Sequence, residues 1–88
     1  MNQKKTVVFG ASLDLDRPSN MALHKLSSKL IETNAFGLKK GMVCELDIDT
    51  ALMAYQDIHT VTTYLNPKRQ QAYYDYIIGL KPARVIFN

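Results

Sequence analysis

The sequence contains a single cysteine and no long apolar run, and each of these absences narrows what the protein can be. Cys44 is the only thiol among the 88 residues, so an internal disulfide and a multi-thiolate metal site are excluded. One unpaired thiol fits a reducing compartment. The polar N-terminus leads directly into a short apolar segment without the apolar core of a signal peptide, and no stretch approaches a membrane span. We therefore expect a cytoplasmic protein without a membrane partner.

A dominant charge of one sign is also lacking. The chain has 11 Lys and Arg against 8 Asp and Glu, a formal net charge of +3, and its basic residues are scattered along the sequence. This distribution is typical of a solvated surface rather than of a nucleic-acid interface. We therefore expect no nucleic-acid partner.

No recognisable catalytic set is present. The 2 histidines have no matching nucleophile, and the aspartates lie in separate loops rather than spaced as an acid and base pair. Asp14 and Asp16 lack the remaining ligands of a calcium loop, which favours a polar turn. Cys44 lies in an alternating apolar stretch with no His or Lys beside it, and we interpret it as a half-buried packing residue. The sequence therefore predicts neither an enzyme nor a metal site.

The apolar pattern predicts strands that alternate with helices. Residues 42–48 alternate apolar and polar side chains, as in a short edge strand. Tyrosines of the last helix recur on one apolar face, which indicates packing rather than stacking on nucleic-acid bases. Because no glycine precedes the polar segment 31–36, an extra helical turn there is an alternative. Strands are expected at 5–9, 31–36, 42–48, 60–65 and 83–87, and helices at 20–30, 49–55 and 67–80.

Two helix starts carry capping signals. Ser19 or Asn20 can cap the first helix after Pro18, and Asn66 followed by Pro67 is an N-cap with proline at the first helical position. Both starts directly follow a predicted strand or its loop, which is the arrangement of β-α units.

Alternation of this kind predicts an α/β fold: an open, mainly parallel, Rossmann-like sheet with helices on both faces. We expect residues 1–88 to form a single domain, with the first strand central and the main strands in the order 2-1-3-4. The ends of the first and third main strands then flank the crevice in which such sheets bind ligands. Gly10–Ser12 and Leu65–Pro67 would face each other across it.

The turn Gly10-Ala11-Ser12 lies between a buried strand and a helix start. This arrangement presents free backbone N–H groups and the positive end of a helix to an anionic ligand. No second glycine follows before Asn20, so the turn is not the G-x-G-x-x-G fingerprint, and a plain turn without a ligand is the alternative.

Five segments together resemble the small bacterial CoA-binding domain proteins, which are Rossmann-like domains related to the nucleotide-binding part of succinyl-CoA synthetase. They are VVFGAS at 7–12, RPSNMA at 17–22, GLKKG at 37–41, TVTTYLNP at 60–67 and LKPARVIFN at 80–88. The resemblance implies non-catalytic binding of CoA or acyl-CoA at the carboxyl ends of the parallel strands.

The resemblance also implies a set of ligand-binding residues. An NAD enzyme places an acidic residue after the second strand, whereas this chain has two lysines there, which suit the phosphorylated ribose of CoA; a solvated loop is the alternative. By this resemblance, Gly10, Ala11 and Ser12 would bind the pyrophosphate, and Arg17, Ser19 and Asn20 would close around it. Lys39 and Lys40 would contact the ribose phosphate. Asn66 and Pro67 would line the opposite wall.

The chain departs from this family in two ways. Family members usually have glycine between the first helix and second strand, where this chain has Leu30 and Ile31. They also continue past the last predicted strand with a loop, a helix and a closing strand, so we expect a fold lacking the last helix and strand, with strand 85–87 partly bare. An exposed apolar face usually marks a partner, so we predict self-association. The alternatives are a truncated interaction or structural protein that has lost the ligand, and a fragment of an NADP- or acyl-CoA-dependent enzyme.

Overall fold

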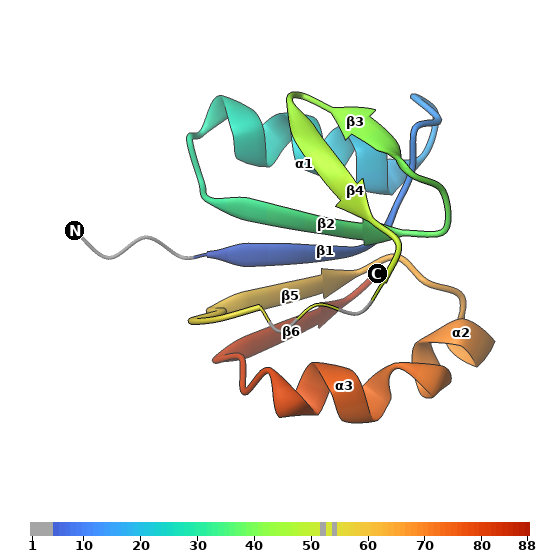
Figure 1. The fold of residues 1–88 in the computed structure, drawn as a ribbon, viewed down its shortest axis with the longest axis vertical. Coiled ribbons are helices and arrows are strands. Elements are labelled where there is room, and N and C mark those ends of the chain that lie inside the picture. The colour runs from blue at the N-terminus through green and yellow to red at the C-terminus, as the bar shows by residue number, and fades with distance from the viewer. Residues whose placement is uncertain (1–4, 52, 54) are drawn as a thin grey trace.

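The computed structural model describes residues 5–51, 53 and 55–88. Within these residues one six-stranded sheet carries α1 on one face and α2 and α3 on the other (Figure 1). The strands are β1 (Thr6–Ala11), β2 (Thr33–Gly37), β3 (Gly41–Val43), β4 (Leu46–Asp49), β5 (Thr60–Thr63) and β6 (Arg84–Phe87), and the helices are α1 (Pro18–Ser28), α2 (Pro67–Ala72) and α3 (Tyr74–Gly79).

The strand order is β3-β4-β2-β1-β5-β6. Only the β3–β4 pair is antiparallel among the described strands, and the other neighbours are parallel. The main strands β2, β1, β5 and β6 therefore follow the predicted 2-1-3-4 order with β1 in the centre. Phe9 pairs with Phe36 on one side and with Thr63 on the other, so the carboxyl ends of three strands meet at one edge. This is the predicted α/β, Rossmann-like sheet.

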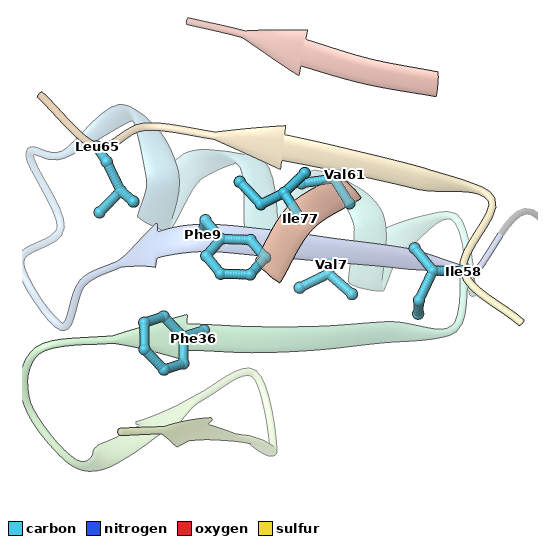
Figure 2. Close-up of a cluster of buried hydrophobic side chains, with 7 residues drawn as sticks. All are labelled: Val7, Phe9, Phe36, Ile58, Val61, Leu65 and Ile77. Atoms are coloured by element: carbon cyan, nitrogen blue, oxygen red, sulfur yellow. The ribbon is translucent and has the colours of Figure 1, made fainter. Parts of the chain in front are cut away.

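The central strand is buried on both faces, which explains its consecutive apolar residues. Val7 and Phe9 pack with Ile77 of α3 in the cluster of Figure 2. Val8 instead packs with Leu23 of α1 on the other face. Because successive side chains of a strand point to opposite faces, β1 joins two separate cores, one under each helical layer.

The segment 42–48 was predicted as one strand, and that prediction is wrong. It forms the hairpin β3–β4, in which Cys44 and Glu45 make the turn with φ of 51° and 65°. Two consecutive left-handed residues match the twist of a two-residue hairpin, although such turns usually contain Asn and Gly. The predicted short helix at 49–55 is also absent: Asp49 ends β4, and the described residues of 50–55 carry no helix, with 52 and 54 outside the described part.

Two tyrosines hold the segment that follows β4, one to the end of β4 and the other to α3. The Tyr55 hydroxyl donates to Asp49 Oδ2 at 2.6 Å, and the Tyr76 hydroxyl donates to the Met53 carbonyl. Burial, together with the hydrogen bond to Asp49, raises the pKa of the Tyr55 hydroxyl well above its ordinary value. Tyr73 and Tyr76 pack against the core of Figure 2, as predicted for the tyrosines of the last helix, and Tyr55 packs there as well.

Helix α1 begins at Pro18, two residues before the predicted start. Its N-cap is Arg17, which makes no side-chain capping bond, so the expectation that Ser19 or Asn20 caps it is wrong. Both residues are buried within the first turn, where proline at the first position supplies the helical φ in advance. Among the described residues no helix has the length and hydropathy to cross a membrane.

The single helix predicted at 67–80 is two helices. Tyr73, with φ of −106° and ψ of 3°, separates α2 from α3. The predicted cap at its start is confirmed, because Asn66 accepts a hydrogen bond from the Arg69 N–H at 2.9 Å and Pro67 occupies the first turn.

Helix α1 ends without a glycine. The Leu30 N–H donates to the Ser27 carbonyl at 3.0 Å and the Ile31 N–H donates to the Leu26 carbonyl at 3.1 Å, the second of which spans the length typical of a Schellman ending. Leu30 adopts φ of 55° and is 86% exposed. The helix therefore stops here without an extra turn, at the cost of a left-handed leucine.

Leu30→Gly is expected to stabilise the protein by about 0.5–1 kcal/mol, because glycine adopts a left-handed φ at no steric cost and the exposed leucine side chain contributes little packing. Urea denaturation of both proteins measures the change. Leu30→Ala is the control, since alanine keeps the backbone strain and is expected to give no gain. Equal stabilities of the two variants would contradict this account of the helix end.

Candidate functional site

An open crevice lies at the edge where β1 and β5 end, which is the edge to which both arrows point in Figure 1. Its volume is about 820 Å³, within the range of cofactor sites. The lining residues are Gly10, Ala11, Ser12, Leu13, Asp14, Arg17, Pro18, Ser19, Leu38, Lys39, Tyr64, Leu65, Asn66, Pro67, Arg69 and Asn88.

The floor of the crevice is the turn at Gly10. Gly10 has φ of 84°, and a Cβ there would lie 3.1 Å from the Tyr64 carbonyl carbon and 3.2 Å from the Leu65 nitrogen. The pairing of β1 with β2 shifts register between Phe9 and Ala11. A glycine is thus required twice over at this point, for its φ and for the close approach of the chain that follows β5.

The loop between β1 and α1 is folded by its own short side chains. The Ser12 hydroxyl accepts from the Asp14 N–H, and Asp14 Oδ1 accepts from the Asp16 N–H, each at 3.0 Å. The Arg17 N–H donates to the Asp14 carbonyl at 3.1 Å. These bonds make the two aspartates parts of a turn that brings Arg17 to the crevice, and among the described residues no metal-ligating cluster forms.

Asn20 supports the turn instead of lining the crevice. Its side chain is buried, and its Nδ2 donates to the Ser12 carbonyl at 2.9 Å. This bond fixes the end of the turn against the first turn of α1. Asn20 therefore positions the loop and does not line the crevice, and its part in ligand binding stays a prediction.

The structure brings most of the predicted binding residues together. Eight of the ten line one crevice, whereas Lys40 is exposed on the following loop and does not line it. The eight residues are Gly10, Ala11, Ser12, Arg17, Ser19, Lys39, Asn66 and Pro67. Their part in ligand binding remains a prediction.

Sequence reasoning missed several lining residues, of which Asp14, Tyr64, Arg69 and Asn88 carry polar side chains. Arg69 lies in the first turn of α2, two residues beyond the segment 60–67 singled out from the sequence. The Asn88 amide donates to Thr62 Oγ1 at 2.8 Å and to the Thr63 carbonyl at 3.2 Å, which fixes it beside the end of β5. A basic residue one turn after a crevice-facing helix start was the signal available for Arg69.

The crevice lining is electropositive. It contains the basic residues Arg17, Lys39 and Arg69 and one acidic residue, Asp14. Within the described part of the chain none of the three basic side chains has an ion pair or a hydrogen bond. The three unpaired cations therefore favour binding of an anionic ligand.

Cys44 acquires a partner that its neighbours in sequence did not reveal. Its Sγ lies 3.0 Å from His24 Nδ1 of α1, and the thiol is half-buried. Neither residue lines the crevice. The half-buried packing position was predicted, whereas the contact with a histidine was not.

The strand order, the glycine turn and the electropositive crevice together define a Rossmann-like domain of the nucleotide-binding class. A family model described as CoA binding domain matches residues 4–88, and the chain belongs to that family. Its fold is similar to the crystal structure of an uncharacterized protein, with a TM-score of 0.93 and 39% sequence identity over 100% of this chain and 73% of that chain. No curated protein matches the sequence.

Proposed function

We propose that the protein binds CoA or acyl-CoA in the crevice and catalyses no reaction on it. The observation that carries this proposal is the set of three unpaired basic side chains around the Gly10–Ser12 turn. CoA supplies the complementary charges, since it carries a diphosphate and a separate phosphate on its ribose. Membership of the CoA-binding domain family supports the same ligand.

Lys39 favours CoA over NAD. It follows β2 and lines the crevice, at the place where NAD enzymes use a carboxylate to bind the ribose hydroxyls. An ammonium group there favours a phosphorylated ribose through a charge-assisted hydrogen bond. Lys40 lies outside the lining, so of the two lysines only Lys39 has this role in the proposal.

The absence of catalysis is proposed from the chemistry of the lining. It contains Ser12 and Ser19 but no His, Cys or Lys–carboxylate pair that would activate a hydroxyl, and the pair of Cys44 and His24 lies elsewhere. The alternative is a fragment of an enzyme whose catalytic groups come from another chain. NADP as a competing ligand distinguishes the proposal from an NADP-dependent fragment, because such an enzyme would bind NADP in preference to CoA.

Isothermal titration of the purified protein with CoA, NADP and NAD tests this function. CoA is expected to bind most tightly, and Arg17→Ala and Lys39→Ala are each expected to weaken it about tenfold or more, as for loss of a charge-assisted hydrogen bond. Lys40→Ala is the matched control and is expected to leave affinity unchanged. Tighter binding of NADP, or no heat with any of the three, would contradict the proposal.

We also propose that the protein self-associates. Tyr74, Ile78 and Phe87 form an exposed apolar surface beside the edge strand β6, with the rings of Tyr74 and Phe87 6.0 Å apart. An open edge strand flanked by apolar side chains favours pairing with a second chain. Light scattering is expected to give a dimer or larger species, and Phe87→Ser to shift it toward monomer. A monodisperse monomer at all concentrations would count against self-association.

A cytoplasmic location is proposed on the ground that the single thiol suits a reducing compartment. Cell fractionation of the native host tests it, and recovery of the protein in an oxidising compartment would contradict it.

A further inference from the structure

Arg69 lies in the crevice with its main chain fixed. It is in the first turn of α2, and its N–H donates to Asn66 Oδ1 at 2.9 Å. Its side chain lines the crevice and, among the described residues, has no ion pair or hydrogen bond. The guanidinium is therefore carried on a defined backbone and is available to a ligand.

Arg69 and Lys39 lie on opposite sides of the central turn. Strand β1 runs between β2 and β5, Lys39 follows β2, and Arg69 follows β5. Gly10 touches the chain that leaves β5, since a Cβ there would lie 3.1 Å from the Tyr64 carbonyl carbon. The β5 side of the turn is thus the side on which Arg69 approaches it.

The phosphates of CoA are separated in the same way. Its diphosphate is central in the molecule and suits the backbone N–H groups of the turn, whereas its third phosphate lies on the ribose. A guanidinium binds phosphate oxygens in bidentate fashion and an ammonium binds as a point charge. Resting on the proposed function, we infer that Arg69 binds the diphosphate from the β5 side, while Lys39 binds the ribose phosphate from the β2 side.

Arg69 and Lys39 therefore have different effects: Arg69 raises the affinity for any ligand with a diphosphate, and Lys39 discriminates between ligands with and without the ribose phosphate. Arg69 contributes equally to every ligand that carries the diphosphate. Lys39 contributes only to ligands that carry the ribose phosphate. Dephospho-CoA, which has the first group and lacks the second, separates the two contributions.

The experiment is calorimetric titration of the full chain with CoA and with dephospho-CoA. Arg69→Ala is expected to weaken both ligands by a similar factor, about tenfold or more, as for a lost bidentate contact with phosphate. Lys39→Ala is expected to weaken CoA alone, to the affinity of dephospho-CoA. Lys68→Ala removes the same charge from the neighbouring residue of α2, outside the lining, and is expected to change neither affinity.

Circular dichroism of each variant checks the fold, and the capping bond of Asn66 to the residue 69 main chain is retained in Arg69→Ala. A loss confined to CoA in Arg69→Ala would place Arg69 at the ribose phosphate and overturn the inference. An effect no larger than that of Lys68→Ala would also overturn it. Wild-type protein that binds neither ligand would refute the proposed function and the inference with it, an outcome distinct from the first two.

Discussion

Replacing Phe9 by alanine is expected to lower the free energy of unfolding by about 3–5 kcal/mol. The ring is fully buried in the central strand. Its centroid lies 5.3 Å from that of Phe36, 6.3 Å from that of Tyr73 and 5.7 Å from that of Tyr76. Truncation therefore leaves a cavity at the point where the sheet meets α3 (Figure 2) and removes three aromatic contacts at once.

A loss of this size is a large part of the stability of a domain, which is typically about 5–15 kcal/mol. Urea denaturation measures it, with Met21→Ala as control, because Met21 lies on α1, outside the crevice and the proposed self-association surface, and is 60% exposed. The control is expected to change stability by about 0.5 kcal/mol or less. A similar loss in both variants would contradict the central place of Phe9 in the core.

The sheet could be predicted because its strongest signals are local. Val7-Val8-Phe9 are consecutive apolar residues bounded by polar ones, which is typical of a strand covered on both faces. The first and third main strands are each followed by a helical segment that crosses to the next main strand, and the right-handed crossover rule then leaves few strand orders. The central place of β1 followed from these two facts.

The hairpin and the helix break could not be predicted because their signals are weak. Cys44 and Glu45 both adopt positive φ, which neither residue type favours, and packing of the hairpin against the α1 core sets that conformation. Tyr73 separates α2 from α3 although neither glycine nor proline stands at the break. In both places tertiary packing overrides local preference.

The crevice was predictable to the extent that its residues directly follow strands. Gly10–Ser12 and Asn66–Pro67 belong to the ends of β1 and β5, so the topology alone places them at one edge. Asn20 and Lys40 lie outside the crevice lining because the Asn20 side chain bonds to the Ser12 carbonyl and Lys40 is exposed on its loop. Arg69 depends on the orientation of a short helix, which spacing alone did not give.

Gly37→Ala is expected to damage stability and ligand binding together. A Cβ on Gly37 would lie 2.3 Å from the Ala11 carbonyl oxygen and 3.1 Å from Ile48 Cγ2. The first obstacle is main chain, which cannot rotate away, so β1 and β2 must move apart at the Ala11–Gly37 pair. Overpacking of this kind costs about 1–3 kcal/mol. Because Ala11 lines the crevice, the affinity for CoA is expected to fall by about tenfold or more, the factor that corresponds to a loss of about 1.4 kcal/mol in binding.

Two other glycines provide matched controls for this substitution, measured by the same urea denaturation and calorimetry. A Cβ on Gly79 would meet nothing within 4 Å, so Gly79→Ala is expected to be neutral or to stabilise α3 by up to about 1 kcal/mol. A Cβ on Gly41 would meet the Leu13 side chain at 2.6 Å, an obstacle that can rotate, so an intermediate loss is expected. Equal stabilities of Gly37→Ala and Gly79→Ala would contradict the close contact between β1 and β2 at Ala11 and Gly37. That contact is the one that holds Ala11, at the Gly10–Ser12 turn, against β2.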